Sequence, residues 1–127
     1  MSSLYLETEE GAQAAVFEWA KCYERLYPCL RLMYHVPNEG KRTKATGARL
    51  CRIGMRRGVP DICLPHPSGV YHGLYIELKA ARGKPTVEQR EYLTALESEG
   101  YFVALCYGSR AAIDTIKRYL GISEVRG

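Results

Sequence analysis

The sequence predicts a single α/β domain in which helices flank a central mixed sheet. Segments with helical periodicity alternate with short apolar runs of strand length, in the order α-β-α-β-β-α-β-α. The chain of 127 residues is 46% hydrophobic, which is enough for one substantial core. It contains no internal repeat and no linker-like stretch. We therefore expect residues 1–127 to form one domain.

The first half of the chain is predicted to contain two helices and one strand. Apolar residues recur every three or four positions over 9–27, and Thr8 is a suitable N-cap for this helix. A strand is expected over 31–36, followed by a turn at 37–40. Segment 43–55 is expected to form a helix rich in basic residues.

The second half is predicted to contain three strands, at 61–64, 73–79 and 101–107, and two helices, at 86–100 and 109–120. A turn-rich segment joins the first two strands, so they can pair as a hairpin. Thr86 is the expected N-cap of the helix that follows, with Gln89 at the capping-box position and Gly100 at its end.

Two charged residues occupy one of these apolar strands. Glu77 and Lys79 are two positions apart, so their side chains share one face of the strand, about 6.5 Å apart. Buried charges are costly unless they are paired or used. Asp61 follows Pro60 and opens the neighbouring strand, so pairing of the two strands would bring Asp61 and Glu77 together beside Lys79.

This cluster predicts metal-dependent cleavage of a phosphodiester. Two carboxylates suit Mg²⁺ or Mn²⁺, which bind through few protein ligands together with waters and substrate phosphate. A lysine beside the ion can orient the attacking water or offset charge that develops on the phosphate. The alternative is a salt-bridged cluster at the edge of the sheet.

Basic residues are concentrated directly before the Asp61 motif. Seven of the 18 lysines and arginines lie between positions 41 and 57, and no acidic residue interrupts them. We expect them to contact a nucleic-acid backbone. The alternative is that they form a solvated helix face and that Arg82 and Lys84 contact the nucleic acid instead. The seven are Lys41, Arg42, Lys44, Arg49, Arg52, Arg56 and Arg57.

These motifs resemble a known family of nucleases. Pro60-Asp61, fifteen residues, and then Glu77-Leu78-Lys79 resembles the PD-(D/E)XK signature. Together with Gly58-Val59 before Pro60, Ile76 before Glu77, and the segment 86–89, the pattern resembles the VRR-NUC branch of that superfamily. The resemblance implies a restriction-endonuclease-like fold and a DNA endonuclease that uses Mg²⁺ or Mn²⁺.

The resemblance also implies roles for individual residues. Asp61 and Glu77 would be metal ligands, the Leu78 carbonyl a further ligand, and Lys79 a catalytic group. Gln89 would reach the lysine or the metal-bound water, although a capping-box role alone is an equal alternative.

The family adds an acidic ligand from the first helix, where Glu9 and Glu10 compete. At roughly 100° per residue, Glu9 lies about 70° from the centre of the apolar stripe and Glu10 about 170° away. We therefore expect Glu9 to be the ligand. The alternative is that Glu9 and Glu10 are both first-turn acids that only interact favourably with the helix dipole.

Substrate and assembly follow from the same resemblance. Members that consist of this domain alone resemble phage-type enzymes that act on branched DNA, such as four-way (Holliday) junctions. Such a junction has near two-fold symmetry, so we expect a homodimer, with the apolar last strand and helix in its interface. The rival functions are a non-catalytic DNA-binding module of the same fold and a sequence-specific restriction-type endonuclease.

The cellular context is predicted from what the chain contains. Five cysteines without Cys-x-x-Cys spacing indicate free thiols in a reducing compartment. No apolar run is long enough to span a membrane. We expect an intracellular protein, in a bacterial or host cytoplasm, with no membrane association and no small-molecule cofactor.

Overall fold

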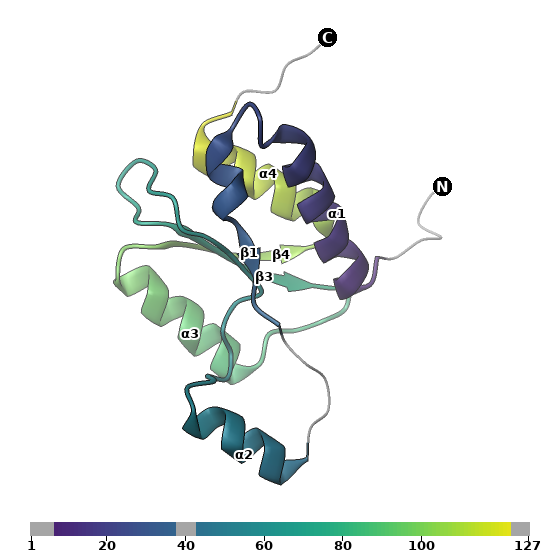
Figure 1. Cartoon of the computed structure of the whole chain (residues 1–127), viewed down its shortest axis with the longest axis vertical. Helices are drawn as coiled ribbons and strands as arrows, with labels where there is room; N and C mark the ends of the chain where they lie inside the picture. The colour runs from purple at the N-terminus through teal and green to yellow at the C-terminus, as the bar shows by residue number, and fades with distance from the viewer. Residues whose placement is uncertain (1–6, 38–42, 123–127) are drawn as a thin grey trace.

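The structure, a computed structural model, describes residues 7–37 and 43–122. It is a layered α/β arrangement with one sheet between helices (Figure 1). The helices are α1 (Glu9–Tyr23), the 3-10 helix η2 (Pro28–Leu32), α2 (Lys44–Arg52), α3 (Val87–Ser98) and α4 (Ser109–Leu120). The strands are β1 (Tyr34–His35), β2 (Ile62–Leu64), β3 (Leu74–Lys79) and β4 (Phe102–Tyr107).

The sheet is mixed, as predicted. Its order is β1-β2-β3-β4, with β2 antiparallel to both β1 and β3, and β3 parallel to β4. The hairpin pairs Ile62 with Ile76, and the parallel pair matches Leu78 with Cys106. The parallel pairing requires a crossover, which α3 provides.

Three helices cover the two faces of the sheet, and one projects from it. Figure 1 shows α1 and α4 together on one face, α3 on the other, and α2 beyond α3 at the end of the molecule. The core lies on the α1/α4 side, where Val16, Ile76 and Ile116 are completely buried. Because side chains alternate along β3, Tyr75, Glu77 and Lys79 point to the opposite face. The helix α2 has no buried residue.

The N-terminal half differs from the prediction in its boundaries. The helix predicted over 9–27 ends at Tyr23, and Leu26 is 70% exposed. The strand predicted over 31–36 is instead the 3-10 helix η2 followed by the two-residue β1. Pro28 favours the first turn of a helix because it has no N–H to leave unpaired. The strand β1 pairs with only two of the three residues of β2.

The other elements lie close to their predicted positions. α4 has the predicted bounds, and β3 and β4 each begin one residue later than predicted. α2 is shorter than the predicted 43–55, because the chain turns at Gly54, whose φ of 118° is outside the helical region. All five cysteines are free, although only Cys63 and Cys106 are buried. No helix in the described ranges is both long and apolar enough to cross a membrane.

Candidate active site

The hairpin of β2 and β3 brings the two predicted carboxylates together. Ile62 pairs with Ile76, so one further antiparallel step places Asp61 opposite Glu77. The backbone N–H of Leu78 donates to Asp61 Oδ2 at 2.7 Å, which attaches the side chain of Asp61 to β3. Asp61 is 7% exposed and Glu77 only 1%. The two acids therefore form a buried pair at the end of the hairpin.

Lys79 completes this cluster on the same face of β3. Its Nζ lies 3.6 Å from Glu77 Oε2, and its side chain is mostly buried. The loop after β3 passes close to it: a Cβ on Gly83 would lie 3.3 Å from Lys79 Cδ. The structure thus brings together the Asp61, Glu77 and Lys79 that the sequence predicts as one site.

One cation does not balance two buried carboxylates. Burial, followed by the charge of Asp61, raises the pKa of Glu77 from 4.5 to about 8, although Lys79 acts in the opposite direction. Burial also raises the pKa of Asp61, against the hydrogen bond from Leu78. The site therefore resists carrying both negative charges unless further positive charge is present.

The donor atoms of this cluster fit a hard divalent cation. Glu77 Oε1 is buried and has no hydrogen-bond partner among the described residues. The N–H of Leu78 points toward Asp61, and in a strand the carbonyl of the same residue points to the same side. No group of three or more His, Cys, Asp or Glu side chains within residues 7–37 and 43–122 is arranged to hold a metal. Two carboxylates suffice for Mg²⁺, which keeps several of its waters.

The first helix contributes a more distant charge. Glu9 and Glu10 are both exposed in the first turn of α1. Burial is the main cause of the raised pKa of Asp61, and the charge of Glu9 adds to it. Glu9 is thus an acid of α1 whose charge acts on Asp61, and its role as a metal ligand stays a prediction.

A neighbouring acid, which the sequence analysis did not single out, positions this helix. Glu7 accepts hydrogen bonds from the N–H of Ser109 at 2.8 Å and from its hydroxyl at 2.6 Å. These bonds attach the start of α1 to the start of α4, directly after β4. Glu7 and Ser109 are 102 residues apart, so no local pattern could have indicated the pair.

Gln89 has the capping role that the sequence allowed. Its Oε1 accepts from the N–H of Thr86 at 2.8 Å, and its own N–H donates to the Thr86 hydroxyl. None of the hydrogen bonds of the described residues joins Gln89 to Lys79. Gly58 lies against the same turn, because an added Cβ would be 2.6 Å from the Glu88 carbonyl. The loop before Asp61 thus packs on the start of α3.

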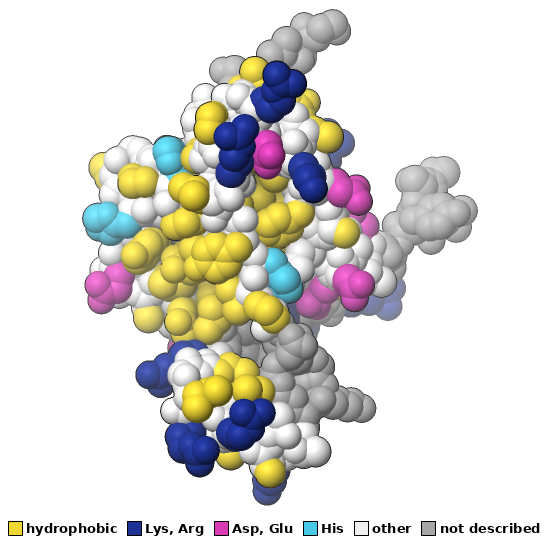
Figure 2. Space-filling model, viewed as in Figure 1, with side chains coloured by type: hydrophobic (Ala, Val, Ile, Leu, Met, Phe, Trp, Pro, Cys, Tyr) yellow, Lys and Arg dark blue, Asp and Glu magenta, His cyan; other side chains and the backbone are white. Residues whose placement is uncertain are grey.

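The described members of the predicted DNA-contacting set lie on α2 and in two loops. Lys41 and Arg42 lie outside the described residues. Arg56 and Arg57 lie in the loop between α2 and β2, and Arg82 and Lys84 in the loop after β3. Figure 2 shows lysine and arginine side chains gathered on the lower part of the molecule, which α2 forms with its exposed Lys44, Arg49 and Arg52. The ion pairs of the described residues, Arg31–Glu24 and Lys79–Glu77, involve none of the exposed cations named here.

The fold and this cluster define a nuclease-type domain of the PD-(D/E)XK class. The sequence profile described as "VRR-NUC domain" matches residues 7–110, so the chain belongs to the VRR-NUC family. A solved structure titled "VRR_NUC domain protein" is similar with a TM-score of 0.78 and 27% identity, covering 97% of this chain and 96% of that chain. Comparison with curated proteins gives no match. The family and the fold predicted from the sequence are both confirmed.

Proposed function

We propose that this protein is a divalent-metal-dependent DNA endonuclease that cuts branched DNA, such as four-way junctions. The observation that carries the proposal is the buried Asp61–Glu77 pair beside Lys79, with one carboxylate oxygen of Glu77 unpartnered. A domain that only bound DNA would gain nothing from two buried carboxylates facing phosphates, which they repel. The VRR-NUC membership supports DNA as the substrate.

Each member of the cluster has a separate task in this mechanism. Asp61, Glu77 and the Leu78 carbonyl would hold Mg²⁺ or Mn²⁺, with Glu9 contributing from α1. When bound, such an ion lowers the pKa of its water and offsets negative charge on the phosphate. Lys79, 3.6 Å from Glu77, is placed to donate a hydrogen bond to the attacking water or to a phosphate oxygen. Gln89 keeps the start of α3 and the Gly58 loop in place.

Exposed cations on both sides of the cluster would hold the DNA backbone. Those on α2 and its following loop lie before Asp61 in the chain, and Arg82 and Lys84 follow Lys79. Phosphate contacts of this kind bind without regard to sequence. A restriction-type activity requires contacts to base edges, so a site held by phosphate contacts favours structure-specific cutting instead.

A homodimer would supply the paired cuts that a four-way junction requires. β4 lies at the edge of the sheet, and in the described part of the chain no strand pairs with its outer side. Leu105 and Tyr107 on this strand are 38% and 45% exposed. An open edge with exposed apolar residues is suited to pairing with a second copy around a two-fold axis.

Cleavage of a DNA panel tests the proposed activity. Labelled four-way junction, flap, splayed and linear duplex DNAs are incubated with Mg²⁺, with Mn²⁺ or with EDTA. We expect metal-dependent cuts in the branched substrates in preference to the duplex. Binding without cleavage of any substrate would establish the non-catalytic alternative, and cuts at one duplex sequence would establish the restriction-type alternative.

Light scattering tests the dimer, with and without junction DNA. We expect the mass of two copies, and a Leu105→Lys variant should lower it by introducing a charge at the β4 edge. A monomer under both conditions would exclude the dimeric model and leave a nuclease that makes single cuts.

A further inference from the structure

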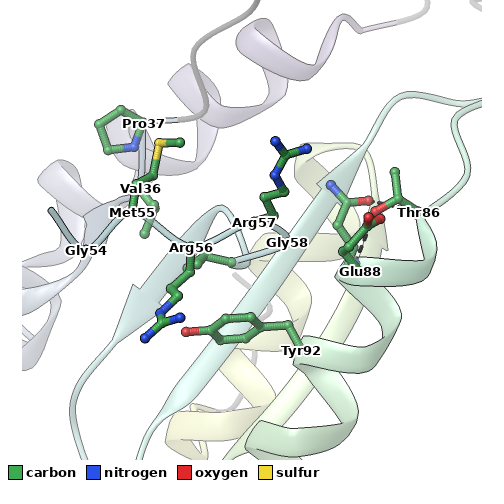
Figure 3. A pocket seen from close by; sticks show the side chains of 12 residues that line it. Val36, Pro37, Gly54, Met55, Arg56, Arg57, Gly58, Thr86, Glu88 and Tyr92 are labelled. Atoms are coloured by element: carbon green, nitrogen blue, oxygen red, sulfur yellow. Dashed lines mark hydrogen bonds between the residues drawn. The ribbon is translucent and has the colours of Figure 1, made fainter. Parts of the chain in front are cut away.

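A groove between the loop after α2 and the start of α3 is not used by the cluster of Asp61, Glu77 and Lys79. We call it the α2–α3 groove; it has a volume of about 600 Å³. One wall is the segment 54–59, and the other presents Thr86, Glu88, Gln89 and Tyr92 from the first turns of α3 (Figure 3). Val36 and Pro37, which follow β1, also contribute to its lining. A groove of this size can hold a ligand as large as a nucleotide.

The lining combines positive charge with an aromatic ring. In Figure 3 the side chain of Arg56 extends toward the hydroxyl end of Tyr92, and Arg57 extends in the opposite direction. Neither arginine forms an ion pair with a described acidic side chain. Among the described residues Glu88 is the only acid in the lining, so Arg56 and Arg57 give this described lining a net positive charge. This favours an anionic ligand that also offers a flat ring to stack on.

The groove lies directly beside the candidate active site. The wall formed by 54–59 includes Gly58 and Val59, and Asp61 follows two residues after Val59. Arg57 is four positions before Asp61, which limits their Cα atoms to at most about 14 Å apart. That distance corresponds to about four base steps along one DNA strand. A strand held in the groove can therefore be the strand whose phosphate reaches the carboxylates.

From this geometry we infer that the α2–α3 groove binds an unpaired nucleotide of a single-stranded DNA segment. The base would contact Tyr92 and the apolar wall at Val36 and Pro37, while Arg56 and Arg57 hold the flanking phosphates. In a duplex the faces of the bases are stacked inside, so only base edges, sugars and phosphates are presented. A concave site with an aromatic wall therefore fits an unpaired strand better than a duplex. The inference rests on the proposed function in that it takes DNA as the substrate, and it specifies branched DNA with an unpaired segment next to the cut.

Binding in EDTA tests the groove separately from cleavage. A short labelled oligothymidine and a duplex of the same length are titrated with the protein and with Tyr92→Ala, Tyr92→Phe and Arg56→Gln variants. Tyr23, which is 41% exposed on α1 and remote from the groove in the chain, provides the control Tyr23→Ala. Loss of one stacking contact should weaken oligothymidine binding by roughly 5- to 150-fold in Tyr92→Ala. Tyr92→Phe and Tyr23→Ala should bind like the wild type, and duplex binding by Tyr92→Ala should be unchanged.

Arg56→Gln alters an exposed side chain, so it tests the groove even if Tyr92→Ala does not fold. It should weaken oligothymidine binding and lower its salt dependence by about 0.7 in slope, the value for one single-strand phosphate contact. Equal losses on oligothymidine and duplex would show that the groove holds duplex phosphates and would overturn the inference. Unchanged binding of both DNAs would overturn it too. Because these titrations contain no metal, failure to cleave any DNA in Mg²⁺ would refute the proposed endonuclease while leaving this result intact.

Discussion

Replacing Glu77 with glutamine should stabilise the metal-free protein while abolishing cleavage. The substitution keeps the volume of a side chain that is 1% exposed and removes its charge. In the folded protein the pKa of Glu77 is raised to about 8, mainly by burial, whereas the ordinary value is 4.5. At about 1.4 kcal/mol per pKa unit, ionised Glu77 costs the fold a few kcal/mol. For a domain of this size, that corresponds to a melting temperature lowered by on the order of 10 °C.

The pH dependence gives this prediction its sign. Between pH 4.5 and about 8, Glu77 is ionised in the unfolded chain but still protonated in the folded one. The unfolded state then binds fewer protons, so wild-type stability falls as the pH rises through this range and stays low above it. Glu77→Gln should therefore match the wild type near pH 4 and exceed it near pH 9.

Thermal melts at several pH values in EDTA measure the effect, with the exposed Glu91→Gln on α3 as the control. Added Mg²⁺ should stabilise the wild type more at pH 9 than at pH 6, because the ligands must be ionised. It should stabilise Glu77→Gln less than it stabilises the wild type. If the melting temperatures of Glu77→Gln and the wild type differed by the same amount at pH 4 and at pH 9, the buried-charge reasoning would be refuted. Cleavage by Glu77→Gln at the wild-type rate would refute its role as a ligand.

Three further substitutions test the surroundings of the cluster. Lys79→Ala should reduce the cleavage rate by at least about a hundred-fold, as expected when one group that stabilises the transition state electrostatically is removed. Circular dichroism should show an intact fold. Glu9→Gln should lower the cleavage rate and weaken Mg²⁺ binding more than Glu10→Gln, because the charge of Glu9 acts on Asp61. The reverse order would reassign the α1 ligand. Arg52→Ala should weaken binding to all duplex sequences alike and lower the salt slope by about one unit, and an unchanged slope would show that this part of α2 is only solvated.

Local patterns in the sequence determined the elements that carry the site. The capping box of Thr86 and Gln89 spans three residues, so the start of α3 is visible in the sequence and is confirmed by its hydrogen bonds. Alternation along β3 placed Glu77 and Lys79 on one face, and the hairpin placed Asp61 opposite. In each case the interacting groups lie on one element or on two neighbouring strands of a hairpin, so backbone periodicity and one pairing step indicate their geometry.

Contacts between distant segments determined the remaining features. β1 is only two residues long and pairs with two residues of β2, and the 3-10 helix occupies the first two positions of the predicted strand. The hydrogen bonds of Glu7 to Ser109 join the first helix to the last, and the parallel pairing of β3 with β4 depends on how α3 crosses over. The raised pKa of Glu77 and the α2–α3 groove arise only when several elements pack together. Burial and long-range pairing are properties of the packed chain, and periodicity in the sequence does not contain them.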